Sequence, residues 1–328
     1  MDQHTRSSVI PIASVREAQE FLRNYLPATR LMDAPSLSRK IGSEVFLKLE
    51  TEQPTGSFKP RGALWALSRN LQRRPVHEVV ASSTGNHGAA VALAAKLLGI
   101  RATIFLPQNP NPVKREKIAA LGAQIVEEGS LDLADAFRKA FEYAKAEGTY
   151  FLNDATDPDV PVGPATIALE IFDKLPQTAA IYVPMGDTAL IRGVASAAKQ
   201  LLPQIRIIGV QAERAPSYRL SWEKGEPVST ATCDTIADGL ATRTPDTYNV
   251  RAIRELVDDI KLVSEQQMID AIRHLLFEEH VVAEPAGAAA TAAILAEQRN
   301  MSGPVVALVT GANVPPSVLR SAMGPVDG

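Results

Sequence analysis

The sequence contains little cysteine, few aromatic residues and almost no net charge. Cys233 is the only cysteine among 328 residues, so neither an intramolecular disulfide nor a cysteine-based metal cluster can form. The formal net charge is −3, and no basic run with interleaved aromatic residues occurs, which argues against nucleic acid or an anionic membrane as a partner. The longest apolar runs, such as AAATAAILA (288–296), are too short to span a membrane. No secretory signal pattern opens the sequence, and we expect a cytoplasmic protein.

Strand-like and helix-like patterns alternate along the chain. Apolar runs rich in β-branched residues are separated by segments in which apolar residues recur every three or four positions. Such alternation predicts an α/β fold in which parallel sheets are covered by helices on both faces. Ser264 and Gln267 form a capping-box pattern, which predicts a helix of about four turns beginning there. The strand-like runs cover residues 44–50, 78–83, 102–107, 123–128, 179–185, 206–212 and 304–311.

Two of the predicted strands run into polar segments that suit ligand binding. In KLETEQPTGSFKPRG (48–62), Lys59 precedes Pro60, a residue that fits the first turn of a helix. A lysine is by default a solvated surface charge, so Lys59 alone indicates no chemistry. In SSTGNH (82–87), hydroxyl residues and a glycine lead directly into an alanine-rich helix whose positive end would hold a carboxylate or phosphate. An ordinary helix cap explains part of this pattern.

Two further strand ends carry ligand-capable groups. IYVPMGDTALIRG (181–193) breaks at Gly186 and enters a helix, where backbone N–H groups would suit an anion, yet Asp187 stands at the turn. In ALVTGANVPP (307–316), Thr310 and Asn313 flank the turn after the last strand. Together with Lys59, these four strand ends suggest a cofactor that has both an anionic group and a carbonyl group.

Six motifs, in order from about Thr29 to Asn313, resemble those of the fold-type II pyridoxal-phosphate enzymes and, among them, the serine/threonine dehydratases (threonine ammonia-lyases). The resemblance implies a tryptophan synthase β-like α/β fold with two open, twisted, mostly parallel sheets covered by helices. It also implies a large cofactor-binding domain (1–63 and 156–328) and a small inserted substrate-side domain (64–155). The motifs are LETEQPTGSFKPRGA, ASSTGNHGAAVALAAKLLG, GPATIALEI, TIADGLA, EPAGAAA and VTGANV.

The resemblance assigns the cofactor, pyridoxal 5'-phosphate, to particular residues. Lys59 would bind it covalently and later act as the base at the substrate's Cα, with desolvation lowering the lysine pKa. Phe58 would lie against the cofactor, and Asn86 would donate a hydrogen bond to its phenolic oxygen. Thr310 would contact the pyridine nitrogen, where a neutral hydroxyl makes the cofactor a weaker electron sink than a carboxylate would. The remaining cofactor residues would be Gly186, Asp187, Thr188, Ala189 and Leu190 around the phosphate, together with Gly239 and Glu284.

The resemblance also implies the substrate and the reaction. Ser83, Thr84, Asn86 and His87 would surround the carboxylate of an amino acid at the helix N-terminus. Thr84 is the second catalytic candidate, because serine racemases of this fold place an acid/base serine there. The expected reaction is β-elimination from L-threonine, L-serine or a close analogue such as hydroxyaspartate. Loss of the β-hydroxyl gives an enamine, which hydrolyses to a 2-oxo acid and ammonia.

The sequence departs from the family pattern in the phosphate loop and at Thr84. Glycines usual in this family are replaced in GDTAL, and Asp187 near a dianion would cost on the order of a few kcal/mol unless its side chain points outward. Thr84 makes serine or aspartate racemisation less favoured but leaves it open. Threonine synthases share Ser-Thr-Gly-Asn, so γ-replacement also stays open, as does an inert cofactor-binding protein. The basic residues available to a phosphorylated substrate near these motifs are Arg61, Arg192 and Arg243.

The resemblance also bears on metal, assembly and regulation. Some relatives bind a divalent cation through a glutamate and an aspartate six residues later. Here Glu213 is followed at that spacing by Arg219, so we expect no metal there and interpret the two residues as an ion pair. We expect a homodimer. The chain ends soon after Asn313, and we expect no regulatory domain or feedback by isoleucine.

Overall fold

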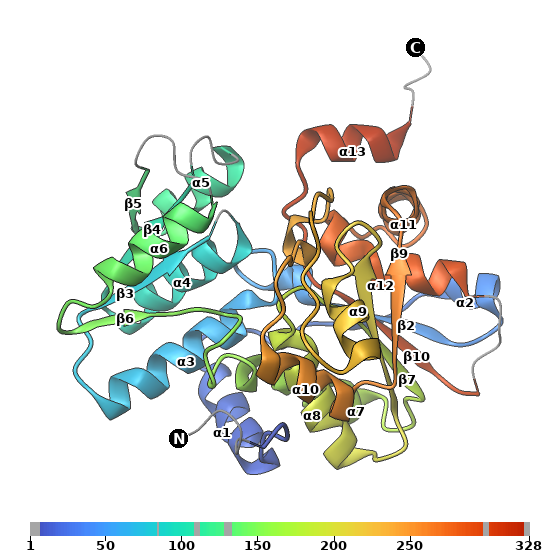
Figure 1. Cartoon of the computed structure of the whole chain (residues 1–328). Helices are drawn as coiled ribbons and strands as arrows, with labels where there is room; N and C mark the ends of the chain where they lie inside the picture. The colour runs from blue at the N-terminus through green and yellow to red at the C-terminus, as the bar shows by residue number, and fades with distance from the viewer. Residues whose placement is uncertain (1–6, 84, 108–111, 128–132, 298–301, 325–328) are drawn as a thin grey trace.

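The computed structural model describes residues 7–83, 85–107, 112–127, 133–297 and 302–324. Its strands form two sheets (Figure 1). In the six-stranded sheet, β1 pairs antiparallel with β2 and every other pairing is parallel. The four-stranded sheet is parallel throughout. The first has the order β1 (Leu31–Asp33), β2 (Val45–Leu49), β10 (Val305–Val309), β7 (Ala180–Pro184), β8 (Arg206–Ala212) and β9 (Asp259–Val263), and the second has the order β5 (Gln124–Val126), β4 (Arg101–Phe105), β3 (Glu78–Ser82) and β6 (Thr149–Phe151).

Helices cover both sheets, which confirms the predicted α/β class. The helix from Ser264 is α11, and its capping box is present, since Ser264 Oγ accepts from Gln267 N–H and Gln267 Oε1 accepts from Ser264 N–H. The helices are α1 (Ile12–Leu22), α2 (Pro35–Ile41), α3 (Lys59–Arg73), α4 (Asn86–Leu98), α5 (Pro112–Ala120), α6 (Leu133–Tyr143), α7 (Val162–Lys174), α8 (Ala189–Leu201), α9 (Ser217–Lys224), α10 (Thr247–Leu256), α11 (Glu265–Phe277), α12 (Pro285–Ala296) and α13 (Pro316–Met323). Short 3₁₀ turns lie at Glu50–Glu52 and Asp238–Leu240.

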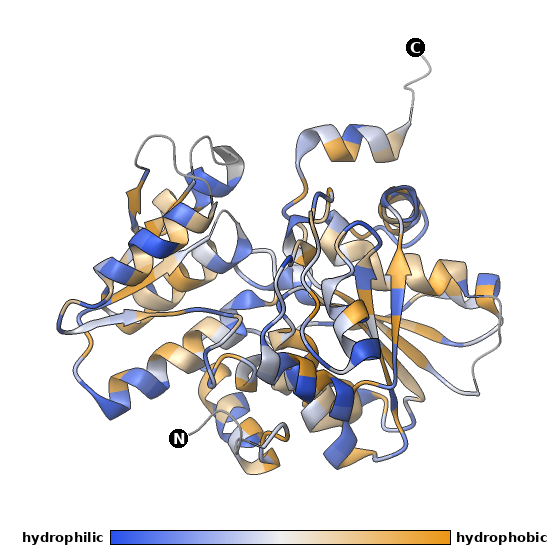
Figure 2. Ribbon diagram, viewed as in Figure 1, coloured by the Kyte–Doolittle hydropathy of each residue, from blue (hydrophilic) through white to orange (hydrophobic). Residues whose placement is uncertain are grey.

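The central strands are buried on both faces. Successive side chains of a strand point to opposite sides, and in β10 Val305 and Ala307 pack with α11 and α12, whereas Val306 and Leu308 pack with α7 and α8. Hydrophobic residues accordingly follow the strands, and hydrophilic residues lie mainly on the outer helices (Figure 2). In the smaller sheet, α3 and α4 cover one face and α6 packs against the other. Within the described parts of the chain, no helix combines the length and apolar character needed to cross a membrane.

Candidate functional site

A cleft of about 230 Å³ lies where the carboxyl ends of β3, β6, β7 and β10 come together. In parallel α/β sheets, ligands bind at such strand ends, because helix N-termini and loops converge there. The cleft brings together most of the site residues predicted from the sequence, although Ala189 is buried behind it and Thr84 lies outside the described residues. The predicted residues that line it are Phe58, Lys59, Ser83, Asn86, His87, Gly186, Asp187, Thr188, Leu190, Gly239, Glu284 and Thr310.

Lys59 is the first residue of α3, and the preceding turn fixes its position. Phe58 N–H donates to the carbonyl oxygen of Thr310 at 3.1 Å, and Ser57 forms a bridge with Gly311, so this turn is tied to the end of β10. Pro60 suits the start of the helix. Lys59 Nζ therefore enters the cleft from a rigid element rather than from a loop.

Two carboxylates hold the Lys59 ammonium group. Nζ donates to Asp154 Oδ2 at 2.5 Å and to Asp187 Oδ2 at 3.1 Å. Burial on its own would lower the lysine pKa, but Asp154 and Asp187 outweigh that effect and raise the pKa above its usual range. Desolvation therefore acts in the expected direction, but in this arrangement the two carboxylates outweigh it. Lys59 becomes neutral only when its contacts with these carboxylates are rearranged or neutralised.

Asp187 faces into the cleft, contrary to the outward orientation that we required for a phosphate loop. Its Oδ1 accepts from Ala189 N–H at 3.1 Å, at the N-terminus of α8. A phosphate contact to Ala189 N–H would need that carboxylate to move aside. The other N–H groups in the first turn of α8 have no acceptor within the helix, so an anion can still be bound there.

Thr188 shapes the same loop through its backbone. Its φ of 77° places a non-glycine residue in the left-handed region, which is uncommon and costs on the order of 1 kcal/mol. The Thr188 hydroxyl is buried and accepts from Arg192 Nε at 3.1 Å. Its own hydrogen remains able to donate, as we expect for a phosphate contact.

A hydrogen-bonded chain of two amides and a buried carboxylate reaches the cleft, which Asn86 and Glu284 line. Asn313 Nδ2 donates to Asn86 Oδ1 at 2.7 Å, and Asn86 Nδ2 donates to Glu284 Oε1 at 2.6 Å. Glu284 Oε2 is buried and has no hydrogen-bond partner among the described residues. Burial, followed by the nearby Asp238 carboxylate, raises the pKa of Glu284 to about 7.

Glu284 should make stability depend on pH. Its folded pKa of about 7 exceeds its ordinary value of 4.5. The contribution of protonated Glu284 to the free energy of unfolding is therefore fully present below pH 4.5 and is lost as the pH rises through about 7. We expect the wild type to lose on the order of 3 kcal/mol of unfolding free energy across this range relative to Glu284→Gln. Denaturant titrations at several pH values measure this difference. The exposed Glu278→Gln is the control, and parallel curves for wild type and Glu284→Gln would contradict the prediction.

His87 and Ser83 are less open to a substrate than the sequence suggested. Nε2 of His87 lies 3.0 Å from the Leu152 carbonyl oxygen, and Nδ1 lies 3.5 Å from Asp154 Oδ2. Ser83 Oγ accepts from Gly85 N–H at 3.2 Å. A substrate carboxylate would therefore meet mainly the N-terminus of α4, with Ser83 at its side.

Sequence reasoning missed three charged residues that line the cleft: Lys114, Asp154 and Asp238. Lys114 and Asp238 form an ion pair between distant segments, and no local pattern indicates it. Asp154 follows the end of β6, a strand that the sequence patterns did not predict. The strand-end signal therefore did not extend to Asp154.

The three arginines considered for a phosphorylated substrate do not line the cleft. Arg61 is buried and bonds the carboxylates of Glu50 and Glu170. Arg192 donates to Thr188 and, at 3.2 Å, to the carbonyl oxygen of Ala155, and Arg243 donates to the Thr230 carbonyl oxygen at 3.1 Å. These three arginines therefore give no support to γ-replacement.

The interpretation of Glu213 and Arg219 as an ion pair is wrong. Arg219 Nε donates to Glu223 at 2.8 Å, one helical turn along α9, and its guanidinium also lies 3.7 Å from Asp259. Among the residues that the structure describes, no cluster of three or more His, Cys, Asp or Glu side chains could hold a metal ion.

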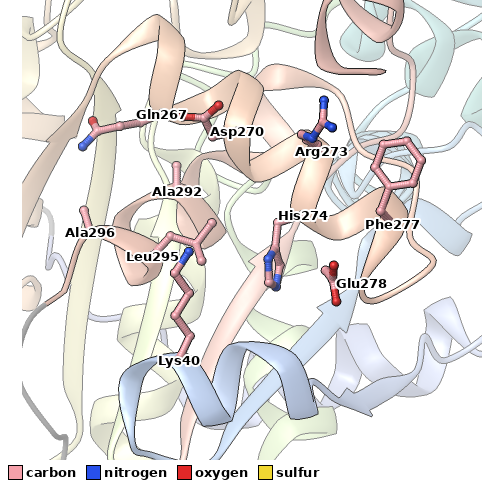
Figure 3. A pocket seen from close by; sticks show the side chains of 10 residues that line it. All are labelled: Lys40, Gln267, Asp270, Arg273, His274, Phe277, Glu278, Ala292, Leu295 and Ala296. Carbon is pink, nitrogen blue, oxygen red and sulfur yellow. The ribbon is translucent and has the colours of Figure 1, made fainter. Parts of the chain in front are cut away.

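A second cavity, of about 460 Å³, lies between α2, α11 and α12 (Figure 3). Lys40 reaches into it from α2 on the side of Leu295, with His274 of α11 next to it and Glu278 beyond His274 (Figure 3). None of the residues predicted for the site lines this cavity. It also receives no parallel-strand ends, so the cleft at Lys59 is the candidate active site.

The residues of the cleft fit pyridoxal phosphate, with Asp187 as the one conflicting charge. The backbone around the cleft is packed so closely that a side chain at Gly186 or Gly311 would clash. A Cβ at Gly186 would lie 2.2 Å from the Gly239 carbonyl oxygen, and one at Gly311 would lie 2.2 Å from Glu284 Oε1. Lys59 suits the cofactor's carbonyl group, and the Thr310 hydroxyl suits a ring nitrogen. Glu284 Oε2 is a buried acceptor without a partner in the described structure, which a ligand donor would satisfy.

Comparisons with known proteins agree with this geometry. Residues 22–311 match the family described as "Pyridoxal-phosphate dependent enzyme". The L-threonine ammonia-lyase of Thermotoga maritima is 38% identical over 307 residues, which are 93% of this chain and 76% of that protein. The catabolic L-threonine dehydratase of Escherichia coli is 35% identical over 321 residues, 97% of each chain. Maize serine racemase superposes with a TM-score of 0.90 at 31% identity, covering 96% of this chain and 97% of the other.

Proposed function

The chain belongs to the family of pyridoxal-phosphate dependent enzymes, and from this premise we propose that it is an ammonia-lyase acting on a hydroxy-amino acid. L-Threonine, L-serine or a close analogue would lose the β-hydroxyl and give a 2-oxo acid and ammonia. The observation that carries the proposal is Lys59 Nζ inside a cleft that also contains Asn86, Glu284 and Thr310. The likeness to the two threonine enzymes named above supports the substrate class.

The bound cofactor supplies an electron sink that weakens the bonds at the substrate's Cα. The chain's own residues bind and orient the substrate and move its protons. The N-terminus of α4 and Ser83 would hold the substrate carboxylate. Once the contacts of its Nζ with Asp154 and Asp187 are rearranged, neutral Lys59 would take the Cα proton, because Lys59 stands in the cleft on a rigid helix.

Racemisation remains the closest rival, because the chain also resembles maize serine racemase. Thr84 would have to serve as the acid/base on the face opposite Lys59. Elimination is preferred because the curated relatives named above are a lyase and a dehydratase. An inert binder would rest on the inward-facing Asp187, and the presence of Lys59, Asn86 and Thr310 in the same cleft argues against it.

We further propose, on the family resemblance, that residues 1–63 and 156–328 form the large domain and 64–155 the small one. The strands of the four-stranded sheet all lie between residues 78 and 151, which supports this division. A homodimer and a cytoplasmic location are proposals on the same basis. Light scattering of the purified protein tests the dimer.

Product analysis tests the proposed function. We expect purified protein with pyridoxal phosphate to release a 2-oxo acid and ammonia in equal amounts from L-threonine or L-serine, and threo-hydroxyaspartate tests the analogue class. Phosphohomoserine should release no inorganic phosphate, and chiral chromatography should find less D-serine than pyruvate. D-Serine as the main product would establish a racemase, and phosphate release would establish γ-replacement. A protein that binds the cofactor but forms no product from any of these would be an inert binder.

A further inference from the structure

Asp187 lies between the two groups of the chain that pyridoxal phosphate has to reach. Its Oδ1 accepts from Ala189 N–H at 3.1 Å, at the N-terminus of α8, and its Oδ2 accepts from Lys59 Nζ at 3.1 Å. A helix N-terminus is the place for the cofactor's phosphate, and the lysine amine is the group for its aldehyde. One carboxylate therefore bonds both attachment points at once.

The two contacts also identify the form in which Asp187 acts. A lysine ammonium and a backbone N–H both donate, so both oxygens of Asp187 accept, as the oxygens of an ionised carboxylate do. Carboxylates and phosphates are alike in accepting hydrogen bonds from N–H groups at a helix N-terminus. Asp187 thus makes with α8 and Lys59 the kinds of contact that the cofactor needs.

The backbone around Asp187 is fixed, so its carboxylate yields by rotating and not by a shift of the loop. Asn249 Nδ2 donates to the Asp187 carbonyl oxygen at 3.2 Å. Gly186 before it packs closely on the Gly239 carbonyl oxygen, and Thr188 after it holds a left-handed φ of 77°. The Asp187 side chain is 22% exposed, so it has a path to solvent.

Asp154 shares only half of this arrangement. Its Oδ2 accepts from Lys59 Nζ at 2.5 Å, as Asp187 does from the other side chain oxygen pair at 3.1 Å. The Ala189 N–H at the start of α8 donates to Asp187 and not to Asp154. The two acids therefore hold Lys59 alike, but they differ at α8.

We propose that Asp187 is an internal competitor of the cofactor and determines how tightly the chain binds it. To bind pyridoxal phosphate, the chain must free Lys59 from this carboxylate and turn the carboxylate away from α8. The other N–H groups in the first turn of α8 stay available, so the competition weakens cofactor binding without preventing it. The inference concerns the binding of the cofactor, and it holds for whichever reaction the bound cofactor serves.

Such a competitor makes the loading of the site depend on the supply of cofactor. The apparent affinity for a ligand falls by the fraction of the protein that is competent to bind it. A chain without a carboxylate at position 187 would therefore stay loaded at lower concentrations of pyridoxal phosphate. The acid in the phosphate loop then sets the occupancy of the site.

Two analogues of the cofactor separate the two attachment points. 4-Deoxypyridoxine 5'-phosphate carries the phosphate but no aldehyde, and pyridoxal carries the aldehyde but no phosphate. We expect Asp187→Ala to bind 4-deoxypyridoxine 5'-phosphate about 10–100-fold more tightly than wild type, because no bonded carboxylate and no like charge oppose the phosphate. Asp187→Asn should gain less, because its amide oxygen can still accept from Ala189 N–H. Absorbance titration of the full chain measures these dissociation constants.

Asp154→Ala is the matched control. It removes a carboxylate from Lys59 but none from α8, so its affinity for 4-deoxypyridoxine 5'-phosphate should rise by less than about threefold. For pyridoxal, which needs only Lys59, both alanine variants should bind more tightly than wild type. Asp234→Asn, at an exposed ion pair with Arg214, should bind both ligands like wild type.

The outcomes separate this inference from the proposed function. An Asp187→Ala variant that melts like wild type but binds 4-deoxypyridoxine 5'-phosphate no more tightly overturns the inference, and so does an equal gain in Asp154→Ala. If Asp187→Ala does not fold, the isosteric Asp187→Asn decides, and an affinity equal to that of wild type overturns the inference. These measurements need no turnover. A chain with the expected affinities that forms no 2-oxo acid would refute the proposed function and support the inference.

Discussion

Lys59→Ala should lower kcat/KM for β-elimination by at least about 10⁴-fold, because the base and the covalent attachment point for the cofactor are lost together. The substitution also leaves Asp154 and Asp187 without the ammonium group that each contacts. Steady-state assays of 2-oxo acid formation measure the effect, and absorbance spectroscopy shows whether the yellow colour of the bound cofactor is lost.

The matched control is Lys145→Ala. Lys145 is exposed, and its ion pair with Glu142 joins neighbouring turns at the surface, so this variant should keep wild-type activity and colour. Wild-type turnover in Lys59→Ala would show that another group is the base.

Arg61→Ala should lower the free energy of unfolding by about 3–5 kcal/mol, because it leaves buried carboxylates without their cation. Arg61 donates to both oxygens of Glu50 at 2.8 and 2.9 Å and to Glu170 at 2.6 and 3.0 Å. The side chains of Arg61 and Glu50 are 3% and 0% exposed. Lys48 Nζ, which lies 2.5 Å from Glu170 Oε2, compensates only part of the negative charge of the two carboxylates. Denaturant titration at neutral pH measures the loss.

The same helix offers the control for this prediction. Arg69 lies two turns further along α3 and pairs with the exposed Glu17, so Arg69→Ala should cost less than about 1 kcal/mol. Arg61→Lys should recover little of the loss, because an ammonium group cannot reproduce the planar, bidentate contacts. Equal costs for Arg61→Ala and Arg69→Ala would show that the buried network adds nothing to stability.

Local patterns predicted the elements that position the site. Apolar runs identified most of the parallel strands, although not β6 and β9. Polar residues that follow the strands, such as Lys59 and Thr310, line one cleft because parallel strands end at the same edge of a sheet. The capping box at Ser264 also formed as expected. These features depend on residues that are close in the sequence, so the sequence alone was sufficient.

The charge state of the site could not be predicted in this way. The pKa of Lys59 depends on Asp154 and Asp187, which lie 95 and 128 residues away in the sequence. Burial was foreseen, but the two carboxylates reverse its effect. The inward orientation of Asp187 likewise depends on a side-chain rotation at the N-terminus of α8, and the sequence does not specify that rotation. Ion pairs between distant segments decide these properties.

The most direct test of the central claim is the site of covalent attachment of the cofactor. The protein is loaded with pyridoxal phosphate, reduced with borohydride, digested and analysed by mass spectrometry. We predict that the reduced cofactor is attached to the peptide that contains Lys59, and that Lys145→Ala gives the same result. A cofactor found on a different lysine, or an unlabelled Lys59 peptide in the loaded protein, would contradict this account.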